Sequence, residues 1–248
     1  MKKVFSEIFL QSVDSTQLYA KRFFHEVPAN EWKIVLAETQ TKGMGQFNRK
    51  WHSPMNNLYT TFVFNYPNHL LESLPCITQV AAVSVSQALE KYNLRGMIKW
   101  KNDVLVNKKK ICGILAEANT LGEQTLVYTG IGVNINMTLE ESKAIDQPNT
   151  SLLIETGKEV DKKEVYSLIR DHFMVNIDVL IEKGFSQFLT YINTNSVAYG
   201  KQVKVVEDGM LVKGEFLGLD QRGFLVLKTD EGQLLVLSSG QMVIEEKD

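Results

Sequence analysis

The sequence predicts an α+β fold in which a larger domain of strands and helices is followed by a small β-barrel. Strand patterns at residues 33–40 and 57–67 alternate with helical patterns over most of the chain. After Ser196 the pattern changes to three short alternating segments separated by glycine-containing turns, a spacing typical of a small antiparallel barrel. We therefore predict two domains, 1–195 and 196–248.

A short helix opens the larger domain. Asp14 or Ser15 suits its N-cap, because an oxygen at this position accepts a hydrogen bond from the first helical N–H groups. Leu18, Phe23 and Phe24 supply an apolar stripe that we expect to face inward.

Two strands and a buried helix come next. Residues 33–40 contain a run of apolar residues, and residues 57–67 alternate apolar with polar side chains until Pro67 ends the pattern. From Ile77 to Tyr92, small apolar residues recur at helical spacing with few breakers, which predicts a buried helix.

The second half of the larger domain begins with a hairpin. Residues 97–118 predict strands joined by a tight turn near 107–108, and residues 126–136 predict a further strand. The clearest helix starts after Asp161 and stops at Gly184. The turns of the C-terminal barrel are expected at Asp208-Gly209, Arg222-Gly223 and Glu231-Gly232.

Composition is that of an ordinary globular protein, with 23% charged residues and a formal net charge of -2, so nothing global indicates nucleic-acid binding. Glu7 and Gln11 interrupt the apolar stretch of residues 1–16, and no apolar run is long enough to span a bilayer. Cys76 and Cys112 are isolated, and the four histidines lack metal-binding spacing. We expect a cytoplasmic protein without membrane association or a protein-ligated metal, in which Cys112 fills the core.

The stretch ETQTKGMGQFNRKWHSP has the character of an anion-binding loop. Gly43 and Gly45 let backbone N–H groups approach an anion closely. Positive potential comes from Lys42, Arg49 and Lys50. The spacing matches neither a Walker A loop nor the dinucleotide fingerprint, and a solvated surface loop is the alternative that this stretch alone leaves open.

A strongly basic hairpin spans residues 99–117, with five lysines against two acids. On one extended strand, Lys99 and Lys101 would face one side, and Trp100 and Asn102 the other. One lysine of the hairpin could then enter a cavity while the others stay in water. The alternative is a solvated basic turn that discourages aggregation.

Two shorter motifs complete the set. TGIGVNIN places Gly130 and Gly132 at the end of a strand, where a flat ligand could lie against exposed backbone, and Asn134 adds amide donors and an acceptor. SVDSTQ presents hydroxyl groups at Ser15 and Thr16, although a simple helix cap explains that motif as well.

The order and separations of these four motifs resemble those of the biotin protein ligases. The shared pattern is a Ser-Thr pair, a Gln before a Gly-x-Gly loop ending in Lys-Trp, a Lys-Trp-x-Asn-Asp segment with a Lys eight residues after its Asn, and Gly-x-Gly-x-Asn. With the terminal barrel, the resemblance covers essentially the whole chain. It implies a mixed, mainly antiparallel sheet with packed helices, like the catalytic domain of class II aminoacyl-tRNA synthetases and of biotin and lipoate ligases, and an SH3-like barrel.

The resemblance also implies a two-step reaction. Biotin is joined to the α-phosphate of ATP, which releases pyrophosphate. The biotinyl group then passes to a lysine of a biotin carboxyl carrier protein or domain of a carboxylase. Magnesium is expected with ATP, bound chiefly through phosphates and water. No DNA-binding module precedes the first motif, so DNA is not an expected partner, and two copies of the chain could pair as a homodimer.

Carried over residue by residue, the resemblance assigns roles to the motif residues. Catalysis is assigned to Lys110, which would neutralise the reacting oxygens, and to Arg49 at the phosphates. Biotin contacts are assigned to Ser15, Thr16, Gln40, Gly43, Gly45, Lys110, Gly113 and Gly130. Nucleotide contacts are assigned to Arg49, Trp51, Asn102, Gly132 and Asn134.

The glycine-containing stretch departs from the family's usual Gly-Arg-Gly-Arg-x-Gly-Arg pattern. Met44 and Gln46 stand where arginines are common, and Asn48 replaces the third glycine. Asn tolerates a positive φ, but neither Met nor Gln can form a charged bidentate contact. We therefore expect a looser hold on the biotinyl-adenylate.

Three alternatives stay open at the level of sequence. Lipoate protein ligases and octanoyltransferases share the fold and use a similarly placed lysine. A nucleic-acid-binding protein could use the lysine hairpin with Trp51 and Trp100, since cations neutralise phosphates and aromatic rings stack on bases. A degenerate ligase that binds biotin without turnover is the third.

Overall fold

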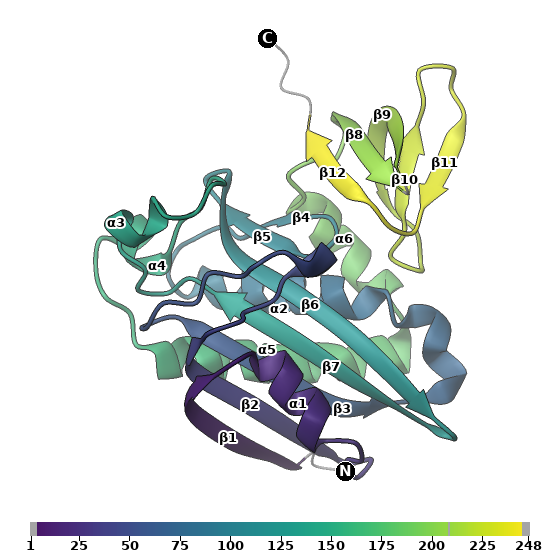
Figure 1. Cartoon of the computed structure of the whole chain (residues 1–248). Coiled ribbons are helices and arrows are strands. Elements are labelled where there is room, and N and C mark those ends of the chain that lie inside the picture. The colour runs from purple at the N-terminus through teal and green to yellow at the C-terminus, as the bar shows by residue number, and fades with distance from the viewer. Residues whose placement is uncertain (1–3, 208, 245–248) are drawn as a thin grey trace.

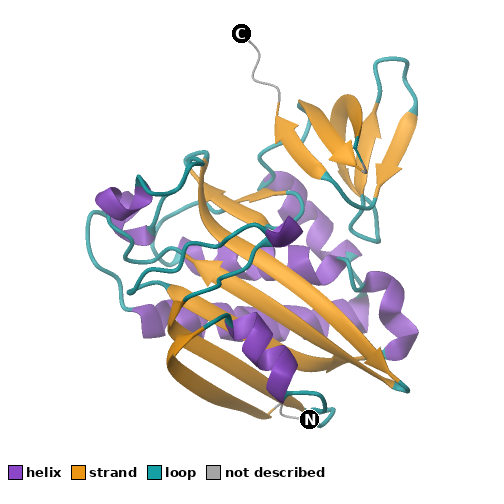
Figure 2. Ribbon diagram, viewed as in Figure 1, coloured by secondary structure: helices purple, strands orange, loops and turns teal. Residues whose placement is uncertain are grey.

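The computed structural model describes residues 4–207 and 209–244, apart from the side chain of Asn48. It has the predicted α+β architecture, in which a large mixed sheet carries helices on both faces and a separate small sheet forms the C-terminal end (Figure 1; Figure 2).

The large sheet is mixed but mainly antiparallel, as predicted. Its strands are β1 (Val4–Val13), β2 (Glu31–Gln40), β3 (Leu58–Tyr66), β4 (Met97–Lys99), β5 (Asp103–Val106), β6 (Lys109–Leu121) and β7 (Gln124–Val133). The spatial order is β1-β2-β3-β7-β6-β5-β4. Only β1 and β2 pair in parallel among these neighbours, because the helix between them carries the chain back across the sheet.

Helices cover the two faces of the large sheet unequally. They are α1 (Thr16–Phe23), α2 (Cys76–Glu90), α3 (Leu139–Ser142), α4 (Leu152–Thr156), α5 (Lys162–Lys183) and α6 (Ser186–Thr194), with 3-10 turns η1 (Gln46–Asn48) and η2 (Asn68–Ser73). In Figure 1, α2 and α5 lie behind the sheet, whereas α1 and the loop that follows β2 lie in front. We call residues 41–57, which join β2 to β3, the glycine loop.

An aromatic cluster anchors α5 to the sheet. The rings of Trp32 on β2 and Phe64 on β3 stack at a centroid distance of 4.2 Å. Phe173 of α5 meets the ring of Phe62 edge-on at 5.2 Å and that of Trp32 at 5.7 Å. All four side chains are buried, so this cluster holds the helical layer against the strands that lead into and out of the glycine loop.

The small sheet is antiparallel throughout. It consists of β8 (Gln202–Glu207), β9 (Met210–Leu219), β10 (Leu225–Lys228), β11 (Leu234–Leu237) and β12 (Gln241–Ile244), in the order β11-β10-β9-β8-β12. Gly209, Gly223 and Gly232 have φ of 80°, 74° and 82°, which confirms three of the predicted turn glycines, while Asp208 lies outside the described residues. The domain boundary near residue 195 stays a prediction.

A buried contact joins the barrel to the larger domain. The carbonyl oxygen of Gly223, in the β9–β10 turn, accepts hydrogen bonds from Trp100 Nε1 at 3.2 Å and from Gln79 Nε2 at 3.1 Å. Since both donors are buried, breaking this contact would leave polar atoms unsatisfied. The barrel is thereby fixed against α2 and the β4–β5 turn.

Several local predictions are corrected by the structure. Phe23 is 61% exposed rather than inward-facing, because α1 turns its Thr16 and Gln17 side toward the sheet. The predicted alternation of residues 99–102 along one strand is wrong, because β4 ends at Lys99 and the chain turns before β5. The parallel strand β1 had not been predicted. The tight turn at residues 107–108 is confirmed, with φ of 50° and 64°.

Across the ranges 4–207 and 209–244, no helix combines the length and apolar character needed to cross a bilayer.

The aromatic cluster generates a stability prediction. Phe173→Ala should lower the free energy of unfolding by about 3–5 kcal/mol, because it leaves a cavity among three fixed rings. Val175→Ala on the same helix is the matched control, since that side chain is 61% exposed and its loss should cost less than about 0.5 kcal/mol. Urea unfolding of both variants measures the difference, and equal effects would contradict the assignment of this cluster as the anchor.

Candidate functional site

A cleft of ≈ 650 Å³ lies on the face of the large sheet that carries α1. Its walls come from segments that are far apart in the sequence: the N-terminus of α1, the glycine loop, the β4–β5 turn, β6, β7, residues 144–149, and residues 240–243 at the edge of the barrel. The cleft therefore exists only because the chain folds these segments onto one face.

The structure brings almost every predicted site residue to this cleft. The lining includes Ser15, Thr16, Gln40, Gly45, Arg49, Trp51, Asn102, Lys110, Gly113, Gly130, Gly132 and Asn134. Gly43 is not part of the described lining and lies buried beside it.

At one end of the cleft, the start of α1 is held by Gln40. The backbone N–H and the hydroxyl of Thr16 both donate to Gln40 Oε1, at 2.9 and 3.2 Å, and Gln40 Nε2 donates to Ser53 Oγ at 3.0 Å. The prediction of Ser15 as the N-cap residue is confirmed, but its hydroxyl makes no capping bond. The hydroxyl and amide groups form a polar end wall of the cleft.

The floor of the cleft is made of glycines covered by an indole ring. Gly113 and Gly132 are opposite each other on β6 and β7. A Cβ atom on either glycine would come within 2.7 Å of the Trp51 ring, so only glycine permits this approach. The indole N–H of Trp51 is buried and, among the described residues, has no acceptor. A ligand in the cleft can supply one.

Lys110 of the basic hairpin enters the cleft and is held there by two contacts. Lys110 Nζ lies 2.7 Å from Asp103 Oδ1 and 5.3 Å from the centroid of the Trp51 ring, within the range of a cation–π contact. Both charged side chains are largely covered, with 17% and 19% exposed. Lys108 and Lys109 are exposed at the turn, as predicted for the solvated lysines. Lys99 also lines the cleft and Lys101 is half-buried, so the prediction of a single inward lysine is wrong.

Cations outnumber acids around the cleft. The lining cations are Arg49, Lys50, Lys99 and Lys110, and the lining acids are Asp103 and Asp146. This excess in a confined, partly covered space attracts an anionic ligand. Within the described part of the chain, no group of at least three His, Cys, Asp or Glu side chains could hold a metal ion.

The glycine loop folds back on itself above the cleft. Met44 pairs with Lys50 in an antiparallel bridge, and Gly45 N donates to Arg49 O at 2.7 Å. At the loop tip, Phe47 has a left-handed backbone, with φ of 56°. A positive φ had been expected to be tolerated at the next residue, Asn48. The loop is thus a short hairpin whose cationic side chains remain exposed.

Some residues of the cleft had not been predicted. Gln17 is buried, donates from Nε2 to Glu117 Oε2 at 2.9 Å and to Tyr128 O at 3.0 Å, and lines the cleft beside Gly130. Its place directly after the Ser-Thr pair was the available signal. Residues 144–149 and 240–243 had no local signal, because only tertiary structure brings them to the cleft.

Both cysteines are free and buried. Burial raises the pKa of the Cys76 thiol to about 12 and also raises the pKa of the Cys112 thiol. A thiol that stays protonated is a poor nucleophile, in agreement with the prediction that Cys112 fills the core.

Comparisons with known proteins agree across the chain. The model of the Biotin/lipoate A/B protein ligase family matches residues 9–136, and that of the Biotin protein ligase C terminal domain matches residues 199–244. A bifunctional ligase/repressor BirA of Bacillus spizizenii is 30% identical over 231 residues, covering 91% of this chain and 70% of the relative. A biotin--[acetyl-CoA-carboxylase] ligase of Paracoccus denitrificans is 28% identical over 240 residues, covering 92% and 96%. A biotin protein ligase from Aquifex aeolicus, solved with biotin and ATP, superposes with a TM-score of 0.82 at 31% identity, covering 98% of this chain and 99% of that chain.

The crowding at Gly43 generates a prediction that does not depend on any ligand. A Cβ atom there would lie 2.5 Å from Trp51 O and 2.6 Å from Ser53 Oγ. Gly43→Ala should therefore displace the loop and lower the free energy of unfolding by about 1–3 kcal/mol. Gly45→Ala is the control, since its nearest neighbour is 3.5 Å away and its backbone is extended. Urea unfolding that ranks the two variants equally would contradict this account.

Proposed function

This chain belongs to the biotin protein ligase family, and from that membership we propose that its cleft carries out two steps. Biotin is first joined to the α-phosphate of ATP with release of pyrophosphate, and the biotinyl group then passes to a carrier protein with release of AMP. Membership makes the chain an ATP-dependent ligase that acts on biotin. One observation carries the assignment of the site: four motifs that are far apart in the sequence line a single cleft around the ammonium group of Lys110.

The comparisons favour biotin over the alternatives that the sequence left open. The first family description covers both biotin and lipoate ligases, whereas the C-terminal match is specific to biotin protein ligases. The curated relatives described above are ligases of biotin or bifunctional ligase/repressors. A nucleic-acid-binding protein without enzymatic activity is not supported by these matches.

The polar end wall suits the ureido ring of biotin. Thr16 and Gln40 are bonded to each other, and Ser15 adds a further hydroxyl group to the same wall. The ureido group needs both donors and acceptors, which these side chains supply. Gly45, Gly113 and Gly130 also line the cleft, and their backbone groups are proposed to contact biotin. Gly43 is proposed to act less directly, by allowing Trp51 and Ser53 to pack closely.

Lys110 is proposed to neutralise the oxygens of the reacting carboxylate and phosphate. Negative charge accumulates on these oxygens as the mixed anhydride forms, and an ammonium group already held in place stabilises that charge without reorganisation. Asp103 and the Trp51 ring hold the ammonium group on the cleft side of β6. Arg49 is exposed on the glycine loop and would meet the phosphates from the solvent side.

The nucleotide is proposed to lie near Asn102 and Asn134. Their Nδ2 groups already donate to Ile114 O at 3.1 Å and Thr150 O at 3.0 Å, which leaves each side-chain carbonyl oxygen to accept from an amino or hydroxyl group of the nucleotide. Gly132 and Trp51 would flank the base. Magnesium is expected to enter with ATP and to be held chiefly by phosphates and water, with Asp103 and Asp146 as the carboxylates of the lining available to it.

The acceptor is proposed to be the carrier protein or domain of a carboxylase, as the name of the Paracoccus denitrificans relative suggests. A cytoplasmic location, the pairing of two copies and the absence of a DNA partner stay predictions. A mass measurement tests the central proposal: a carrier domain incubated with this protein, biotin, ATP and magnesium should gain one biotinyl group. Modification with lipoate in place of biotin would contradict it.

The role of Lys110 generates a kinetic prediction. Lys110→Ala should slow adenylate formation at least about tenfold, which corresponds to roughly 1.4 kcal/mol of transition-state stabilisation. Lys109→Ala is the matched control, because that neighbouring side chain is exposed. Release of pyrophosphate measures the step, and an undiminished rate in the Lys110 variant would show that another lysine is responsible.

The departures in the glycine loop generate a second kinetic prediction. Gln46→Arg should slow the escape of biotinyl-adenylate, because a guanidinium group can make charged, bidentate contacts that glutamine cannot. Gln46 lines the cleft, so the longer side chain is within reach of the ligand. Filtration of the enzyme after adenylate formation gives the escape rate, and equal rates in both proteins would refute the idea of a looser hold.

A further inference from the structure

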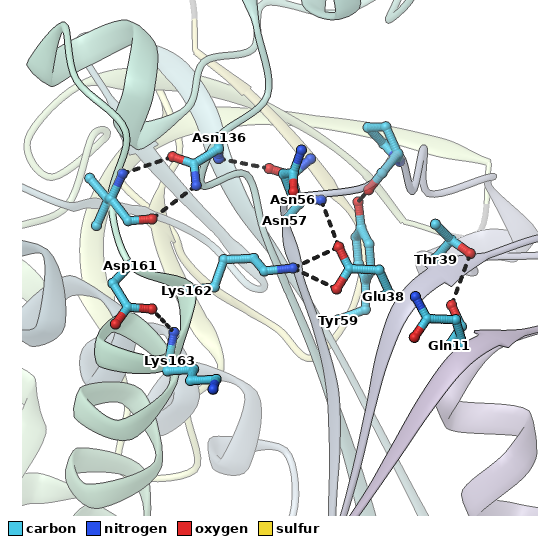
Figure 3. Close-up of polar contacts among 12 residues, drawn as sticks. Gln11, Glu38, Thr39, Asn56, Asn57, Tyr59, Asn136, Asp161, Lys162 and Lys163 are labelled. Atoms are coloured by element: carbon cyan, nitrogen blue, oxygen red, sulfur yellow. Dashed lines mark hydrogen bonds and ion pairs between the residues drawn. The ribbon is translucent and has the colours of Figure 1, made fainter.

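A polar cluster lies outside the cleft, where the glycine loop meets the rest of the protein (Figure 3). Its centre is the carboxylate of Glu38, near the end of β2. Lys162 Nζ, at the start of α5, donates to both oxygens of this carboxylate, at 2.8 and 2.7 Å. The strand that leads into the glycine loop is thus tied to the long helix behind the sheet.

The same carboxylate also holds the far end of the loop. The backbone N–H of Asn56 donates to Glu38 Oε1 at 3.1 Å, and Asn56 has a left-handed backbone with φ of 65°. Its carbonyl oxygen accepts from Asn136 N at 3.1 Å. Glu38 therefore joins the entrance and the exit of the glycine loop at one point.

Asn57 extends the cluster to the end of β7. Its buried side-chain oxygen accepts from the backbone N–H groups of Ile135, Asn136 and Met137, at 2.7, 3.1 and 3.1 Å. The side chain of Asn136 in turn bonds both the N–H and the carbonyl of Val160, just before α5. The loop exit is thus fixed beside Asn134, which lines the cleft.

The ion pair at the centre is largely covered by protein, with 13% of the Glu38 side chain and 28% of the Lys162 side chain exposed. Burial opposes ionisation of Glu38, but the bonds from Lys162 and Asn56 outweigh it, so that the pKa of the carboxyl is lowered. Removing either charge leaves the other covered and without its partner, which costs more than loss of a surface ion pair.

The cleft lining, as far as the structure describes the chain, includes none of Glu38, Asn56, Asn57 and Lys162. We propose that these four residues, the loop clasp, position the glycine loop for the ligase reaction, with Glu38 and Lys162 as its positioning pair. The clasp holds the two ends of the loop together in the free protein, so that less conformational entropy is lost when the loop closes over biotin and ATP. This inference rests on the proposed function.

The clasp has a kinetic signature that distinguishes it from a merely structural contact. If the loop has its binding conformation in only a fraction of the molecules, the apparent affinity for the ligand is reduced in proportion to that fraction. Saturating ligand restores the closed loop, and since no clasp residue touches the reacting atoms, kcat is preserved. A general loss of folded protein would instead lower kcat at unchanged KM.

Glu38→Gln and Lys162→Met test the proposal. Each should raise the KM for biotin at least about fivefold while kcat for adenylate formation stays within about twofold, and trypsin should cleave faster after the exposed Arg49 and Lys50. The double variant should be no worse than the more severe single variant, because the two residues act through one contact. Lys163→Met, at the adjacent exposed position of α5, is the control and should leave all three measurements unchanged.

Unchanged KM in both single variants would overturn the clasp. So would a lower kcat at constant KM, because that result indicates lost folded protein. If the unmodified chain forms no adenylate, the proposed function fails, and the rate of trypsin cleavage then tests the clasp separately. Faster cleavage of the glycine loop in Glu38→Gln than in the unmodified chain supports the clasp, and equal cleavage overturns it.

Discussion

The close approach of the Trp51 ring to the backbone of β6 and β7 is the contact on which the cleft depends. Gly113 and Gly132 sit opposite each other in the register of the sheet, and any side chain at either position would collide with the indole. Because the ring rests there, the glycine loop lies over the sheet and faces α1 from across the cleft. The ammonium group of Lys110, paired with Asp103, then lies over the same ring. Packing at two glycines thus places the charged pair to which we assign the proposed chemistry.

The tip of the glycine loop and its two ends are held differently. The tip of the glycine loop carries exposed cations and few tertiary bonds, whereas its ends are fixed by the bidentate Glu38–Lys162 pair and by Asn57. On the proposed function, closure over a ligand would require ordering of the tip alone, which would limit the conformational entropy lost. The barrel contributes from the other side, since Gly223 receives bonds from Trp100 and Gln79 and residues 240–243 complete the wall.

Much of the fold and the site could be predicted because the signals for them lie in residues that are close together in the sequence. Periodicity marks α5, which ends at Gly184 as expected, and turn chemistry marks the positive φ at Gly223 and Gly232. The motif residues could be grouped by their order along the chain, and nearly all of them line one cleft. The prediction failed where the chain turned unexpectedly: residues 100–102 leave the strand pattern, and α1 turns a polar side inward.

By itself, the sequence determined the class of fold, the basic hairpin and the residue types available for binding an anion, because periodicity and charge are properties of neighbouring residues. Tertiary structure alone decided that Lys110 is the lysine paired with Asp103, that Gln17 joins the polar wall, and that Glu38 bonds Lys162 and Asn56. Some of these contacts join residues that lie more than a hundred positions apart in the sequence. Strand order and helix packing set their geometry, and no local pattern encodes it.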